Sequence, residues 1–156
     1  MKKILTFILI FSLILFPMNV FASSGASASS SSEIEYLDNG DYLIYTIEND
    51  TPQNFQPFSK TVTKSKYARY YHNNSVQWYV KVTGTFTYGG GTSKCTSSSV
   101  SAKSNANVWK IASSSSGKSK NTASATATAK HYYNNSVVDT VTRTVKLTCS
   151  STGKFS

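Results

Sequence analysis

The stretch ARYYHNNSV, residues 68 to 76, recurs as AKHYYNNSV at residues 129 to 137, an offset of 61 residues (129 − 68). Both copies stand between segments in which apolar and polar residues alternate, which is the pattern of half-buried β-strands. Asn tolerates the positive φ that tight turns require. Each copy therefore predicts the tip of a β-hairpin. The alternative is a pair of equivalent ligand sites, but the turn is already a sufficient reason for the repeat.

The residues around the second turn predict the length of its loop. A row of alternate alanines precedes the turn and a row of valines follows it. A loop of odd length places both rows side by side on one buried face, whereas a two-residue loop places them opposite each other. We therefore expect three-residue loops at residues 134–136 and 73–75. The expected core rows are Ala123, Ala125, Ala127 and Ala129; Val137, Val141, Val145, Leu147 and Cys149; and Val76, Trp78, Val80, Val82, Phe86 and Tyr88.

The chain after Glu33 is rich in Val, Thr, Tyr and Ser, alternates with period two and has no sustained helical stripe. This pattern predicts an all-β fold, an antiparallel β-sandwich or flattened barrel of about eight short strands built from hairpins. The expected strands span residues 34–37, 41–48, 59–72, 75–88, 93–103, 107–114, 120–133 and 136–149. Besides the two NNS stretches, turns are expected at DNG (38–40), GGG (89–91), SNA (104–106) and SSGK (115–118).

The N-terminus has the three regions of a secretory signal peptide. Lys2 and Lys3 precede an apolar run from Ile4 to Phe16, and Val20-Phe21-Ala22 stands before a serine tract. This order predicts cleavage after Ala22. An uncleaved anchor is the alternative, but the run has 13 residues and a membrane span needs about 20. We expect a secreted protein, either free or associated with the cell wall, with residues 1–22 removed.

The remaining 134 residues (156 − 22) are enough for one domain with a single core. Residues 23–32, SSGASASSSS, predict a flexible leader, and residues 33–156 predict one β-sandwich domain. Two cysteines in an exported chain usually form a disulfide, whereas zinc would want four ligands and no histidine stands at ligand spacing. We therefore expect a disulfide between Cys95 and Cys149, and no metal site.

Charge is unevenly distributed along the chain. Residues 33–50 hold six of the seven acids and no Lys or Arg, whereas residues 51–156 hold fourteen basic residues and one acid, Asp139, which gives 14 − 1 = +13. Without the signal peptide the net charge is 13 − 6 = +7. Such a field attracts polyanions. We expect an anionic cell-wall polymer or a glycan as partner and do not favour nucleic acid; the alternative is that the acidic segment neutralises the basic body.

The expected outward face of the first hairpin carries Tyr67, Arg69, Tyr71, Tyr79 and Lys81. Aromatic rings flanked by cations can stack on sugar rings while the charges hold a phosphate or carboxylate. The same residues also fit ordinary cross-strand tyrosine pairing, which stabilises a sheet without any ligand. These five residues are the candidate ligand-binding site.

The sequence nominates no catalytic site. His131 is expected to pair across the second hairpin with Asp139, but no nucleophile or second carboxylate is placed beside them. His72 is a polar residue at a turn. Gly89-Gly90-Gly91 joins two strands and does not open a helix, so it is no phosphate cradle. We expect neither enzymatic activity nor a cofactor.

Three stretches, VKVTGTFTYGGGTSKCT (80–96), SATATAK (124–130) and VKLTCSSTG (145–153), resemble those of small exported proteins of Gram-positive bacteria that have no established function. The resemblance implies export and an all-β fold and supplies no catalytic residues. A more distant likeness is to secreted β-sandwich bacteriocins of the lactococcin group. We expect a monomeric, non-enzymatic binding or cell-envelope-associated protein; the alternatives are a secreted toxin or bacteriocin and a small hydrolase.

Overall fold

The computed structural model describes residues 32–49 and 59–156. The predicted signal peptide and the leader up to residue 31 lie outside these ranges. The described residues form eight strands, the expected number, and no helix. They are β1 (Ser32–Tyr36), β2 (Tyr42–Asn49), β3 (Lys60–His72), β4 (Ser75–Gly89), β5 (Thr92–Ser104), β6 (Trp109–Ser119), β7 (Thr122–Tyr133) and β8 (Ser136–Thr148).

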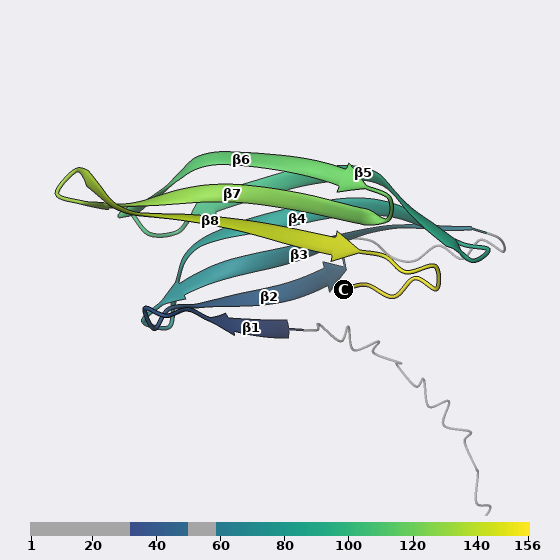
Figure 1. Ribbon diagram of the computed structural model, residues 1–156, viewed down its shortest axis with the longest axis horizontal. Coiled ribbons are helices and arrows are strands. Elements are labelled where there is room, and N and C mark those ends of the chain that lie inside the picture. The colour runs from purple at the N-terminus through teal and green to yellow at the C-terminus, as the bar shows by residue number, and fades with distance from the viewer. Residues whose placement is uncertain (1–31, 50–58) are drawn as a thin grey trace, which may run out of the picture.

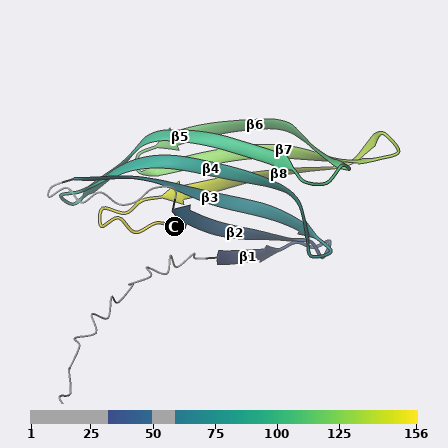
Figure 2. The same ribbon diagram turned by 180° about the vertical axis from the view of Figure 1, so that it is seen from behind.

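The strands make two antiparallel sheets that face each other as two layers (Figure 1). The larger sheet has the order β1-β2-β3-β4-β5 and the smaller one β6-β7-β8. Strand β8 lies over β3 and β4, and β7 lies over β4 and β5. The two sheets stay separate, so the fold is the expected sandwich and not the flattened barrel. Figures 1 and 2 show that the turn of the β7–β8 hairpin extends beyond the other strands, at the same end as the β1–β2 and β3–β4 turns.

The two NNS hairpins reach the expected register by a different route. Both Asn residues of each turn have positive φ, between 48° and 62°, so each loop has two residues, Asn73-Asn74 and Asn134-Asn135. A β-bulge follows at once: Tyr71 pairs with Val76 but Tyr70 pairs with Trp78, which leaves one extra residue on β4. The second hairpin repeats this shift. The three-residue loop was therefore wrong, but the predicted parity is correct because the bulge supplies the third residue.

This register gives the sandwich its core. The Ala row of β7 is fully buried, as predicted, and so are most of the inward residues of β4 and β8. Small Ala side chains let the two sheets approach closely: a Cβ added to Gly84 on β4 would lie 2.8 Å from the Cβ of Ala123 and 2.6 Å from the ring of Phe86. The bulges correct two predictions, because Val76 and Val137 both precede the shift. Val137 is 47 % exposed, and Val76 is half-buried and lies outside the core.

The turn predicted at SSGK (115–118) was also wrong. These residues remain in β6, where Ser115 to Lys118 pair with β7. The chain turns instead at Lys120-Asn121, with Lys120 at a φ of 51°. The serine run stays extended because each residue from Ser113 onward finds a partner on the alternating Ala/Thr strand β7.

The predicted disulfide is wrong, because Cys95 and Cys149 are both free thiols in the core. Each cysteine instead binds the β6–β7 turn through its backbone: the N–H of Cys95 donates to the carbonyl of Lys120, and that of Cys149 to the carbonyl of Asn121. Their small apolar side chains fill buried positions, which is an ordinary use of cysteine without covalent bonding. Their positions are therefore explained by packing and turn contacts.

The turns predict a difference between two substitutions of Asn135, whose φ is 62°. Asn135→Ala should lower the free energy of unfolding by about 1–2 kcal/mol, because in the left-handed region the Ala Cβ comes too close to the following carbonyl oxygen. Asn135→Gly should be nearly neutral, because Gly has no Cβ. Thermal or denaturant unfolding of both variants measures this. Equal stability of the Ala and Gly variants would contradict the turn geometry.

The thiols predict a specific alkylation pattern. Burial raises the pKa of both Cys95 and Cys149 above the ordinary value of 9.0, so native thiols should react slowly with iodoacetamide. In denaturant without reductant, both should be alkylated, and mass spectrometry should find two adducts. An unfolded protein that takes up no label unless a reductant is added would show that the cysteines are bonded after all.

Candidate functional site

Four of the five residues of the candidate ligand-binding site form one cluster on the outward face of the larger sheet. Tyr67 pairs with Lys81, and Arg69 pairs with Tyr79. The Arg69 guanidinium lies 4.0 Å from the centre of the Tyr67 ring, and the Lys81 amine lies 5.3 Å from it. The rings of Tyr67 and Tyr79 are 5.7 Å apart and tilted. The cluster is half-buried, so it presents aromatic edges and cations to solvent together.

Tyr71, the fifth residue, belongs to a neighbouring aromatic row on the same face. Its ring stacks on Tyr42 at 4.9 Å, with 7° between the planes, and Tyr42 also contacts Tyr36 at 6.0 Å. Tyr36 is 76 % exposed. The structure thus extends the predicted site sideways onto β1 and β2. We call the combined surface the tyrosine face; it consists of Tyr36, Tyr42, Tyr67, Tyr71, Tyr79, Arg69, Lys81 and Lys103.

The tyrosine face carries a positive charge after its internal ion pair is counted. Arg69 forms a salt bridge with Glu48 at 2.9 Å, so these two charges cancel. Lys81 and Lys103, which pair with β5 and β4 respectively, make no ion pair among residues 32–49 and 59–156. The acidic β1–β2 segment therefore neutralises one cation of this face and leaves two amines.

A second candidate site lies between the two sheets, at the end of the sandwich that carries the β1–β2, β3–β4 and β7–β8 turns. A cavity of about 450 Å³ brings together residues from five strands, β3, β4, β6, β7 and β8, and from the β1–β2 and β5–β6 connections. Its chemically distinctive lining residues are Asp41, Tyr70, His72, Trp109, His131 and Asp139. We call it the end cavity. Of the described residues that line it, none is Lys or Arg.

Asp41 is held rigidly on one side of the end cavity. Its carboxylate accepts hydrogen bonds from the Tyr70 hydroxyl, from His72 Nδ1 at 2.6 Å and from the Asn39 amide at 2.9 Å. The Asn73 amide lies 3.1 Å from His72 Nε2, on the far side of the imidazole. Asp41 is 7 % exposed, so a buried charge is here satisfied by three donors.

The same network changes two pKa values. Burial alone raises the pKa of Asp41, but the hydrogen bonds from Tyr70, His72 and Asn39 outweigh burial and bring it below the ordinary 3.8. Burial, the hydrogen bond to Asp41 and the nearby charge of Asp139 raise the pKa of Tyr70 to about 12. At neutral pH the carboxylate is therefore ionised and the phenol remains a donor.

His131 and Asp139 occupy the other side of the end cavity, paired across the second hairpin as the sequence predicted. The His131 ring stacks on Trp109, with centroids 4.8 Å apart and 9° between the planes. Its ring nitrogens have no hydrogen-bond partner among the described residues. The Asp139 carboxylate accepts only the N–H of Thr140 within that same part of the chain. Both groups are thus free to bind a ligand.

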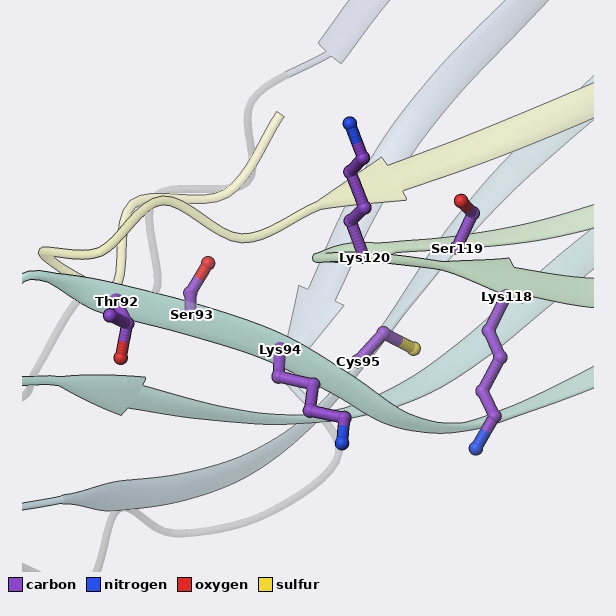
Figure 3. Close-up of a pocket in the computed structure, with 7 residues that line it drawn as sticks. All are labelled: Thr92, Ser93, Lys94, Cys95, Lys118, Ser119 and Lys120. Carbon is purple, nitrogen blue, oxygen red and sulfur yellow. The ribbon is translucent and has the colours of Figure 1, made fainter.

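A third depression, of about 660 Å³, lies at the β6–β7 turn and holds Lys94, Lys118 and Lys120 beside Cys95. Figure 3 shows that the amines of Lys94 and Lys118 point to one side of the turn and that of Lys120 to the other. Lys118 also donates to the carbonyl of Thr96. The three cations do not converge on one point, so this depression is not an assembled anion site.

Comparison with protein-family models, curated proteins and solved structures found no match to this chain. Among residues 32–49 and 59–156, no helix is long and apolar enough to cross a bilayer. The same residues contain no cluster of His, Cys, Asp and Glu that could hold a metal ion.

The sequence predicted that five residues of the tyrosine face share an outward face, and the structure places them so, but the sequence did not predict the end cavity. Sequence reasoning placed His131 opposite Asp139 and then set the pair aside for want of a second carboxylate nearby. The structure supplies one, because Asp41 lies on the opposite wall although 98 residues (139 − 41) separate the two aspartates. The sequence predicts a polar turn residue at His72, and in the structure its imidazole also binds Asp41. No motif or spacing in the sequence predicts a site built from such distant segments.

The lowered pKa of Asp41 predicts how acid destabilises the protein. A carboxyl whose folded pKa is depressed stabilises the fold above its unfolded pKa, 3.8, and that stabilisation is lost as the pH falls through the folded value. Asp41→Asn should therefore lower the free energy of unfolding by about 1–3 kcal/mol at neutral pH, and the difference from wild type should shrink below about pH 4. Melting curves across this range measure it, with Asp38→Asn as the exposed control. A constant difference at all pH values would contradict this role.

Proposed function

We propose that this protein is a secreted, non-enzymatic binding protein of the cell envelope, which attaches through the tyrosine face to an anionic wall polymer or glycan. The observation that carries the proposal is the Tyr67 ring, contacted by both Arg69 and Lys81 and adjacent to Tyr79. Tyrosine rings provide stacking surfaces for sugar rings, and the amines provide charge for phosphate or carboxylate groups.

The shape and charge of this face support a polymer rather than a small molecule. The five-stranded sheet presents tyrosines on four neighbouring strands, from Tyr36 on β1 to Tyr79 on β4, and Lys103 continues the row on β5. Neighbouring strands lie about 4.8 Å apart, so the row spans several sugar units. A long ligand can therefore contact all five strands at once.

A secreted toxin or bacteriocin is the second candidate, and one observation favours it. The projecting tip of the β7–β8 hairpin exposes Tyr133, Val137 and Val138, and Val108 lies beside it (Figures 1 and 2). Exposed apolar patches mark protein or membrane contacts. If this candidate is correct, the protein should permeabilise anionic lipid vesicles, and Val137→Ser with Val138→Ser should abolish that effect.

The proposed function predicts loss of binding when the tyrosine face is changed. Tyr67→Ala plus Tyr79→Ala should weaken binding to a purified Gram-positive wall fraction, since each stacked ring contributes about 1–3 kcal/mol. Lys81→Gln plus Lys103→Gln should weaken it at low salt and matter less as salt rises, because screening shortens the reach of the charges to about 8 Å at physiological ionic strength. Sedimentation with the wall fraction measures both.

Matched controls come from the other sheet. Tyr133→Ala removes an exposed ring from the β7–β8 tip, and Lys146→Gln removes an exposed cation from β8. Both should bind like wild type. If the controls lose binding as much as the tyrosine-face variants, or if wild type does not sediment, the proposed function is wrong. Separate assays with the glycan and the anionic polymer identify the ligand.

A further inference from the structure

The two repeats differ at one pair of positions that faces inward. On the side of each bulge away from the turn, the next cross-strand pair is Tyr70 with Trp78 in the first hairpin and His131 with Asp139 in the second. His131 and Asp139 follow Tyr70 and Trp78 at the repeat offset of 61 residues (131 − 70 and 139 − 78). Tyr70 and Trp78 are buried in the core. The second repeat thus places a polar, ionisable pair where the first has two aromatic rings.

Contacts among the described residues do not account for the polar pair. Asp139 is exposed and His131 is half-buried, so the pair lies at the solvent-accessible end of the sandwich and not in its core. The Asp139 carboxylate accepts one backbone hydrogen bond from its own neighbour, and the His131 nitrogens have no partner among the described residues. The pair opens instead onto the end cavity, opposite Asp41 and Tyr70.

We propose that the end cavity is a binding site for a small organic cation, a ligand that carries an ammonium or guanidinium group. Such a group donates several hydrogen bonds from a positive centre, which matches the two aspartates and the free acceptor atoms of the cavity. The volume of about 450 Å³ suits a ligand of amino-acid side-chain size. This site is separate from the tyrosine face and goes beyond the proposed function.

The charges around the cavity support a cation over an anion. Residues 51–156 carry a net charge of 14 − 1 = +13. No Lys or Arg is among the described residues that line the cavity. Asp139, the one acidic residue of the sequence from 51 to 156, does line it. Asp41 is buried beside Tyr70, and the low local dielectric there strengthens its attraction for a cation. Distant lysines are screened by salt.

The two walls have different roles. Asp41 already accepts three hydrogen bonds, so it supplies a fixed negative charge and keeps Tyr70 and His72 in place. Asp139 has unused acceptor capacity and is the group that should contact the ligand directly. Substituting Asp139 therefore tests binding without disturbing the Asp41 network, because Asp139 is exposed and makes only a local hydrogen bond.

The experiment is an NMR titration of the full secreted chain with acetyl-arginine amide and its neutral isostere acetyl-citrulline amide. The chain has two histidines, and both line the end cavity, so their ring signals report on this cavity. The arginine compound should shift the signals of His131 and the Trp109 indole in a saturable way, and the citrulline compound should bind about two- to fivefold more weakly. Asp139→Asn should weaken binding of the arginine compound by a similar factor.

Asp38→Asn is the matched control, since Asp38 is an exposed aspartate three residues from Asp41 that does not line the end cavity. It should bind the arginine compound like wild type. Equal binding of the arginine and citrulline compounds, no saturable shift, or a shift produced only by a neutral sugar such as methyl glucoside would each overturn the proposal. Unchanged affinity in Asp139→Asn, with a wild-type melting temperature, would overturn it as well.

Discussion

The architecture depends on one local device, a two-residue Asn-Asn turn followed at once by a β-bulge. The turn alone would leave the alanines of β7 and the valines of β8 on opposite faces. The bulge adds the residue that brings both rows to the same face, and the first hairpin does the same with β3 and β4. Because the side-chain period of a strand is two, a shift of one residue decides which face is buried. The whole core follows from this parity.

The same device also positions the candidate sites. The register of the first hairpin turns the rings and cations of the tyrosine face outward. The register of the second hairpin turns the His131–Asp139 pair toward the other sheet. The sheets approach each other closely at Ala123 and Gly84, whereas the end cavity opens at the end that carries the β1–β2, β3–β4 and β7–β8 turns. Packing and binding are thus two consequences of one register.

The free thiols show how tertiary placement changes the meaning of a residue. Two cysteines in an exported chain indicate a disulfide on general grounds. In the structure, each is buried and binds a different carbonyl of the β6–β7 turn. A composition rule reports what pairs of cysteines usually do, whereas the distance and orientation of their side chains decide whether these two bond.

The sequence by itself determined the fold class, the number of strands, the parity of both hairpins and the five residues of the predicted binding face. These are local properties, since the alternation of side chains and the chemistry of Asn-Asn turns act over a few residues. Only the tertiary structure decided that a bulge supplies the third residue, that Tyr36 and Tyr42 extend the tyrosine face, and that Asp41 and His72 line one cavity with His131 and Asp139. The lining joins segments up to 98 residues apart (139 − 41), and the packing of one sheet on the other brings them together.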